Sequence, residues 1–243
     1  MDLLANDYLL VGGIIFLAAL TQSITGFGFA LVSMSFLPQV VGLQTAVPLV
    51  TLVSIIANIV IWYSYRRDCD FKAVKQLVIA ALLATPIGVL LLDYLPEAIA
   101  LKGLGILITS YVLYDWLKFR LPSFKSSIWA YFFGGMSGIL NGAYTTGGPP
   151  VIIYANCRRW QPREFKGNLT AIFFFSSLLA AITHSIQGNI TIAVGKLAMY
   201  SFPGFALGLW LGILLSKTTN PVIFKRITLA LLLLSGLRLL YEI

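Results

Sequence analysis

The chain has 243 residues, of which 58% are hydrophobic and 11% are charged, and its mean hydropathy is +0.88. A soluble domain carries about 25% charged residues, so this composition excludes a soluble globular protein and indicates a polytopic membrane protein. The net charge is +8. In a membrane protein an excess of Lys and Arg marks cytoplasmic loops and contacts with anionic lipid, so we expect the lipid bilayer, and not nucleic acid, as the partner of these charges.

Eight apolar segments are long enough to be candidates for the roughly 20 residues that a membrane crossing needs. They cover residues 8–38, 42–65, 71–93, 98–118, 127–155, 164–187, 190–215 and 221–241. The first segment is interrupted at Thr21–Gly28 and the fifth at Asn141–Pro150. Glycine permits backbone angles that a helix cannot hold, and proline lacks the amide hydrogen. Both segments are therefore predicted to break near their centres.

A broken backbone in hydrocarbon survives only where protein or a water-filled cavity satisfies its polar groups. The two interruptions therefore indicate functional sites, and a structural kink packed among neighbouring helices is the alternative. Similar residues also occur in the same order in the two halves of the chain: Thr146-Gly147 corresponds to Thr25-Gly26, and Thr170 corresponds to Thr51. We expect a single transmembrane domain over 1–243, with repeat 1 over about 1–121 and repeat 2 over about 122–243.

Charge counting selects a topology. If all eight segments cross, the seventeen Lys and Arg divide nine against eight, which gives no orientation. If the two interrupted segments are re-entrant hairpins, fourteen share one side, and Lys102, Lys196 and Arg238 face the other. Because cytoplasmic loops are rich in Lys and Arg, the re-entrant arrangement is preferred. It predicts six crossings, three per half, with both termini on the outside.

The predicted fold is thus an all-α polytopic membrane protein with two inverted repeats, each a broken helix hairpin plus three transmembrane helices. One hairpin would enter from each face, and their tips would meet near the midplane, where secondary transporters build substrate sites. The weak point is that residues 8–24 are almost long enough to cross on their own.

The tips are suited to a small oxyanion. A half-helix that starts after a break directs free amide hydrogens and a partial positive charge at the tip, while hydroxyl and amide side chains add donors without buried charge. A sodium ion held by unwound carbonyls is the competing ligand. The predicted substrate-binding residues are Gln22, Ser23, Thr25, Gly26, Phe27, Gly28, Asn141, Tyr144, Thr145, Thr146, Gly147, Gly148 and Pro149.

Five further residues are candidates to line the pathway: Thr51, Asn58, Arg163, Lys166 and Thr170. Asn58 is equally suited to a hydrogen bond between helices. Arg163 and Lys166 are also the cations expected at the cytoplasmic end of a membrane helix. The glycines at 204, 208 and 212 are four residues apart and predict close helix packing. A homodimer interface is one possible use of this glycine face.

No cofactor, metal site or enzymatic activity is expected, because no Cys/His/Asp/Glu cluster and no nucleophile with a base is visible in the membrane core. Acidic residues also avoid the middle of the segments, so no proton carrier is identified. An anion moves outward along an inside-negative potential without a coupling ion, whereas its uptake would need one.

Several of these residues resemble the sulfite exporter TauE/SafE family, also called the toluene-sulfonate uptake permease family. The run Gly147-Gly148-Pro149-Pro150, followed by Gln161–Phe165 and Thr170, is similar to its second-half signature, and Thr25–Gly28 to its first-half signature. The resemblance spans nearly the whole chain. It implies a bacterial or archaeal inner-membrane transporter for sulfur-containing or other small organic anions.

The function predicted from the sequence is export of small organic or sulfur-containing oxyanions, such as sulfite, sulfonates or small carboxylates, across the inner cell membrane by alternating access. Two alternatives stay open: an anion-selective, channel-like pore and an ion-coupled uptake permease.

Overall fold

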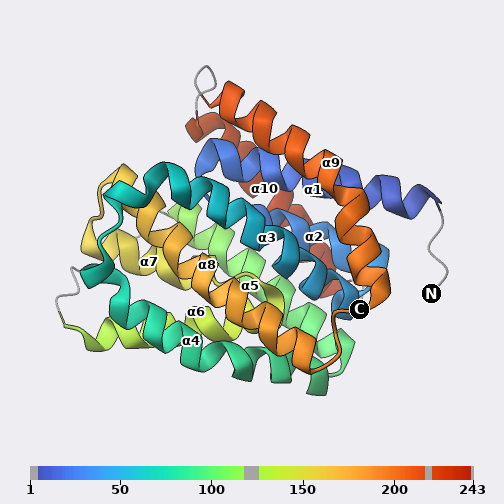
Figure 1. The fold of residues 1–243 in the computed structure, drawn as a ribbon, viewed down its shortest axis with the longest axis horizontal. Helices are drawn as coiled ribbons and strands as arrows, with labels where there is room; N and C mark the ends of the chain where they lie inside the picture. Colours follow the sequence, from blue (N-terminus) through green and yellow to red (C-terminus); the bar gives the residue numbers. More distant parts are fainter. Residues whose placement is uncertain (1–4, 118–125, 217–220, 242–243) are drawn as a thin grey trace. The chain divides into compact units, whose positions relative to one another are not determined.

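The structure is a computed structural model that describes residues 5–117, 126–216 and 221–241. Within these ranges the chain is helical throughout, with ten α-helices and one short 3₁₀ helix (Figure 1). The helices are α1 (Ala5–Thr25), α2 (Phe29–Val41), α3 (Leu43–Tyr65), η1 (Arg66–Asp68), α4 (Phe71–Tyr94), α5 (Glu97–Leu117), α6 (Ile128–Tyr144), α7 (Gly148–Arg158), α8 (Pro162–Ile186), α9 (Ile192–Leu215) and α10 (Pro221–Tyr241).

The interruptions predicted in the first and fifth segments are confirmed. The first break comprises residues 26–28, between α1 and α2, and the second break comprises residues 145–147, between α6 and α7. The other six predicted segments each coincide with one continuous helix, with ends that differ by at most two residues. The helices follow the apolar runs, and the two breaks lie where glycine, or glycine followed by proline, interrupts them. Pro38, Pro48, Pro86 and Pro203 lie inside helices.

Six helices in the described part of the chain are long and apolar enough to cross a membrane: α1, α3, α4, α5, α8 and α9. This set differs from the predicted crossings, because it includes α1 and omits α10, which carries Lys225, Arg226 and Arg238. At about 1.5 Å per residue, the 21 residues of α1 extend about 30 Å, comparable with the hydrocarbon core. The membrane depth of the first break therefore stays a prediction, as does the inverted repeat.

The helices group into two compact units. The first unit contains α1, α2, α5, α9, α10 and the first half of α3; the second contains the rest of α3 together with α4, α6, α7 and α8. Each unit takes helices from both halves of the sequence. The predicted division into repeats at about residue 121 is not tested by this grouping and stays a prediction.

Glycines join α4 and α6 in the second unit. A Cβ atom on Gly134 of α6 would lie 2.5 Å from the carbonyl oxygen of Leu77 of α4, and Gly138 and Gly142 meet the α4 backbone one and two turns further on. Because both series advance in the same direction, the two helices run parallel. Small residues in register allow this close backbone contact between membrane helices.

An equivalent seam joins α1 and α9 in the first unit. A Cβ on Gly204 would lie 2.6 Å from the carbonyl oxygen of Gly12, and Gly208 and Gly212 meet the next two turns of α1. The close packing predicted for these three glycines is confirmed. They face α1 of the same chain, so they are not an open dimer face, and the suggestion of a homodimer loses its basis.

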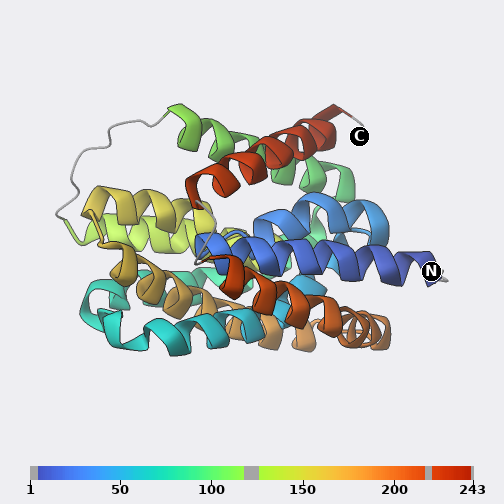
Figure 2. The same cartoon turned by 90° about the horizontal axis from the view of Figure 1, so that it is seen from above.

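The segment α6–α7 folds back on itself. The hydroxyl of Ser137 in α6 donates to the carbonyl oxygen of Gly147 at 2.7 Å, and further from the break the rings of Phe133 and Tyr154 are 6.0 Å apart. In the first unit α2 likewise turns back beside α1 (Figures 1 and 2). Both interrupted segments are therefore helical hairpins.

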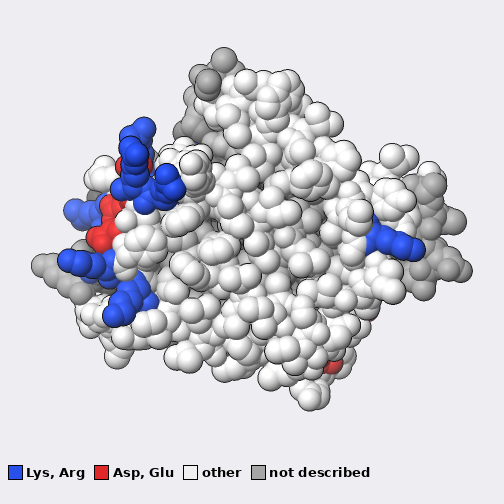
Figure 3. Space-filling model, viewed as in Figure 1, with Lys and Arg blue, Asp and Glu red and all other residues white. Residues whose placement is uncertain are grey.

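The hairpin α6–α7 brings two basic loops together in the second unit. The amide of Asp70 donates to Asn168 Oδ1 at 2.8 Å, and Lys166 Nζ donates to the hydroxyl of Tyr65 at 3.4 Å. The exposed cations Arg66, in η1, and Arg158, the last residue of α7, lie in or beside these loops, and in Figure 3 most of the Lys and Arg on the face drawn there gather at one end. The contact agrees with the hairpin form of α6–α7, and the re-entrant topology of this segment in the membrane stays a prediction.

Candidate functional site

The second break begins with a tight helix end. Thr145 adopts the left-handed conformation with φ of 55°, and its amide donates to the carbonyl oxygen of Asn141 at 2.8 Å. The amide of Thr146 then reaches back six residues to Leu140 at 3.3 Å. The bond from Thr145 is that of a left-handed (αL) helix ending, and both bonds satisfy carbonyls that the terminated helix leaves open. The chain thereby reverses direction within three residues.

Gly147 is required at this break by space. A Cβ there would lie 2.6 Å from the carbonyl oxygen of Ser137 and 2.8 Å from its hydroxyl. Gly148, the first residue of α7, has more room, because its nearest neighbour from another helix is the ring of Phe173 at 3.7 Å. Tyr144 and Pro149 are buried beside the break.

Two buried donors at the second break have no hydrogen-bond partner, Asn141 Nδ2 and the hydroxyl of Thr146. Their residues are only 2% and 1% exposed. A buried polar group left without a partner costs about 1–3 kcal/mol, so these atoms are candidates to donate to a bound solute. Pro149 and Pro150 remove two of the four amide hydrogens that a helix start normally offers, which makes side-chain donors more important here.

The first break is built differently. Gly26 and Gly28 have φ of 86° and 100°, values that glycine adopts readily. The hydroxyl of Thr25 lies 2.8 Å from the carbonyl oxygen of Thr21 and 2.7 Å from that of Phe27. It therefore serves the turn itself. The first turn of α2 contains no proline, so all its amide hydrogens remain available.

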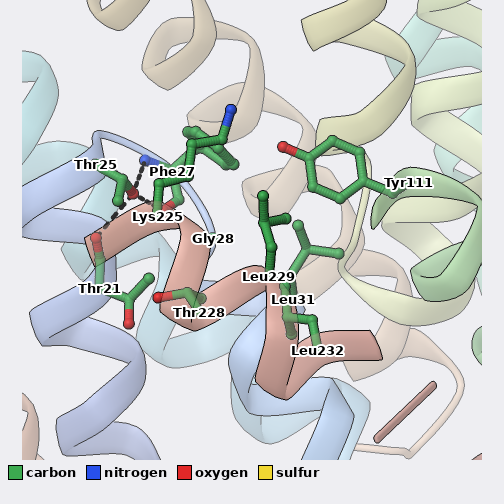
Figure 4. Close-up of a pocket in the computed structure, with 10 residues that line it drawn as sticks. All are labelled: Thr21, Thr25, Phe27, Gly28, Leu31, Tyr111, Lys225, Thr228, Leu229 and Leu232. Atoms are coloured by element: carbon green, nitrogen blue, oxygen red, sulfur yellow. Dashed lines mark hydrogen bonds between the residues drawn. The ribbon is translucent and has the colours of Figure 1, made fainter. Parts of the chain in front are cut away.

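A small pocket opens at the first break (Figure 4). Its ten lining residues come from α1, the first break, α2, α5 and α10, all within the first unit, and it encloses about 10 Å³, which is room for about one water molecule. Predicted residues Thr25, Phe27 and Gly28 are among them. Lys225 of α10 also lines the pocket and forms an ion pair with Asp115 of α5.

Sequence reasoning missed Lys225 and Tyr111. The charge count treats Lys225 only as a cation on the cytoplasmic side, and the sequence does not distinguish Tyr111 from the other aromatic residues of its segment. The one available signal was weak: Asp115 and Lys225 each lie near the end of an apolar segment, where opposite charges can pair. Their contact depends on how α5 packs against α10.

Two other predicted substrate-binding residues near the first break, Gln22 and Ser23, do not line the pocket. The hydroxyl of Ser23 donates to the carbonyl oxygen of Ala19 at 2.8 Å, and the side chain lies against Gly212 in the α1–α9 seam. Gln22 is buried at 5% exposure. Ser23 therefore packs against α9, whereas Thr21 and Thr25 of the same helix line the pocket.

The predicted pathway residues do not form one described cavity. Thr51, Asn58 and Thr170 are buried, and the hydroxyls of Thr51 and Thr170 donate to carbonyl oxygens of their own helices, at 2.9 and 2.7 Å. Arg163 is exposed at the start of α8. Lys166 lies over the ring of Tyr65, 5.2 Å from its centroid. These two cations belong to the basic loops described above.

The described ranges contain no group of three or more His, Cys, Asp or Glu side chains that could hold a metal ion. Among the described residues, the polar groups at the second break are hydroxyls and amides, and those at the first break are hydroxyls and the Lys225 ammonium paired with the Asp115 carboxylate. Hydroxyls, amides and an ammonium suit an oxyanion, which accepts hydrogen bonds.

Comparison with known proteins gives a family. The family described as Sulfite exporter TauE/SafE matches residues 11–239. A protein of Cupriavidus necator named "Probable sulfite/organosulfonate exporter TauE" is 26% identical over 227 residues, which cover 90% of this chain and 88% of that protein. No solved structure matches the chain.

Proposed function

The chain belongs to the TauE/SafE family of sulfite exporters, a family of membrane transporters, and from this premise we propose that it exports small oxyanions across the inner membrane. The substrate class comprises sulfite, sulfonates and small carboxylates. Transport proceeds by alternating access around the two interrupted helices, and both termini lie on the periplasmic side.

The observation that carries this proposal is the pair of buried donors at the second break. Asn141 Nδ2 and the Thr146 hydroxyl lie at a helix interruption without partners. An amide nitrogen donates and does not ligate a cation, so this site favours an anion over the sodium ion considered from the sequence. The N-terminus of α7 adds a partial positive charge beside them.

Outward transport of an anion follows from the membrane potential. Moving one negative charge from an inside-negative compartment gains about 2.3 kcal/mol per 100 mV. Export can therefore proceed without a coupling ion, and the sequence places no acid near the middle of a predicted crossing. Uptake against the same potential would require a driving ion gradient.

The test is flux from proteoliposomes that contain the purified full chain. Vesicles loaded with sulfite, ethanesulfonate or acetate should release at least one of these anions faster when the interior is made negative. Counterflow that saturates with substrate supports alternating access, whereas flux that rises linearly with concentration indicates a pore. Dependence on an imposed sodium or proton gradient would indicate the uptake permease, and release of none of the anions would overturn the proposed substrate class.

Topology has its own test in intact cells. After replacement of Cys69 and Cys157, single cysteines at Ala5 and at exposed Gln39 should both react with an impermeant thiol reagent from the periplasm. Labelling of only one of the two positions would show that α1 and α2 do not begin and end on the same side.

A further inference from the structure

The pocket at the first break contains a cation that the proposed function does not yet use. We propose that Lys225 and Tyr111 bind the anionic group of the substrate in this pocket, and that the substrate replaces Asp115 as the partner of Lys225. This inference rests on the proposed function and specifies a binding site for the same anions.

Lys225 is held in place but remains accessible. Its ammonium pairs with the carboxylate of Asp115 and lies 5.5 Å from the centre of the Phe27 ring, at the break itself. The two charged side chains are 33% and 21% exposed. Because water screens a partly exposed pair, its net attraction is small, and an arriving oxyanion can take the place of the carboxylate.

Tyr111 supplies an independent observation that points to a ligand. The residue is 3% exposed, and its hydroxyl has no hydrogen-bond partner. Tyr111 and Asp115 are one helical turn apart on α5, which places them on one face. In Figure 4 the hydroxyl end of Tyr111 points towards the Lys225 side chain. The aromatic ring packs edge-on against Phe27 with centroids 6.3 Å apart, so the hydroxyl is held at the pocket.

The remaining lining determines the chemical class of the substrate. Leu31, Leu229 and Leu232 line the pocket with the polar groups. An anionic head bound by Lys225 and Tyr111 would leave a short alkyl tail against these leucines, where burial of each CH₂ group is favourable. The space of about 10 Å³ takes up a solute only after Lys225 and Asp115 separate. The leucines beside it then favour a short-chain organic sulfonate or carboxylate over inorganic sulfate.

The test measures binding of ethanesulfonate to the purified full chain by calorimetry, with sulfate as the comparison anion. Lys225→Gln should weaken binding about tenfold or more, since hydrogen bonds to charged groups are the stronger ones. Lys225→Arg should retain binding. The matched control is Arg226→Gln, because this neighbouring cation on α10 is exposed and does not line the pocket.

Two further variants separate a binding role from a structural one. Asp115→Asn removes the competing carboxylate and should tighten binding about threefold. Tyr111→Phe keeps the ring and removes the donor, and should weaken binding about two- to tenfold without lowering the melting temperature of the ligand-free protein. If the ion pair only stabilises the fold, Lys225→Gln and Asp115→Asn should both weaken ethanesulfonate binding and lower the melting temperature.

The outcomes distinguish this inference from the proposed function. Opposite effects of Lys225→Gln and Asp115→Asn on ethanesulfonate binding, with Arg226→Gln unchanged, establish the site. Wild-type binding and flux in Lys225→Gln overturn the inference while the transporter stands, and so does a shared loss in both charge variants with lower melting temperatures. Absence of flux of every tested anion in the wild type overturns the proposed function and the inference together.

Discussion

The two helix breaks perform the same structural task with different groups. At the first break the hydroxyl of Thr25 is bonded within the turn, the following helix keeps its amide hydrogens, and the ammonium of Lys225 lies nearby. At the second break prolines remove two amide hydrogens, and Asn141 and Thr146 provide buried donors without partners.

Positions that were matched between the two halves of the sequence therefore have different surroundings. The hydroxyl of Thr25 is bonded within its turn, whereas the hydroxyl of Thr146 has no hydrogen-bond partner. We infer that the first break binds an anion through the Lys225 ammonium and that the second break binds one through neutral donors. Variants that affect one break and spare its counterpart test this division.

The glycines at the two breaks differ in the same way, and the largest effect is expected at Gly147. Gly28 is required by its backbone angle, and a Cβ there would make only an ordinary contact at 3.5 Å, whereas Gly147 is required by lack of space. Gly147→Leu should abolish flux and lower the yield of folded protein, because overpacking costs about 1–3 kcal/mol or more. Gly135→Leu is the matched control on α6, since a Cβ there meets nothing within 4 Å. Equal flux in both variants would contradict the tight packing of the second break.

Thr146→Val tests the neutral donor of the second break. Loss of one hydrogen bond to a charged substrate should reduce flux about tenfold. Because the hydroxyl has no partner in the protein, the melting temperature of the ligand-free form should stay the same or rise. Thr183→Val is the control, since that hydroxyl donates to the carbonyl oxygen of Leu179 in its own helix. Normal flux in Thr146→Val would remove this residue from the site.

Thr25→Val should mainly lower the stability of the protein, whereas Thr146→Val should mainly lower flux. The hydroxyl donates within the turn of the first break, so its loss should lower the stability of the protein by about 1 kcal/mol. The effect appears as a lower melting temperature in the absence of substrate, and ethanesulfonate binding should fall less than in Lys225→Gln. A drop in binding equal to that of Lys225→Gln, with an unchanged melting temperature, would assign Thr25 to the substrate after all.

The sequence was sufficient for the helices and the breaks because those features depend on local chemistry. Apolar runs set the helices, and the glycines and prolines of Asn141–Pro150 set where one of them stops. The row Gly204, Gly208 and Gly212 predicted close packing but could not identify α1 as its partner. The Lys225–Asp115 pair joins residues 110 positions apart, and charge counting treats each cation only as a marker of its loop.

The smallest effect is expected for Ser23, a predicted substrate-binding residue. Its hydroxyl already donates to the carbonyl oxygen of Ala19, and its side chain packs against Gly212 in the α1–α9 seam. Such bonds to the preceding turn contribute little to helix stability, so Ser23→Ala should change flux by less than about twofold. Ser23→Leu is the contrasting variant, because the seam has no room for a larger side chain, and it should reduce folded protein. A large loss of flux in Ser23→Ala, with normal folding, would mean that the solute reaches α1 on the face that packs against α9, and the division of labour between the two breaks would have to be redrawn around that face.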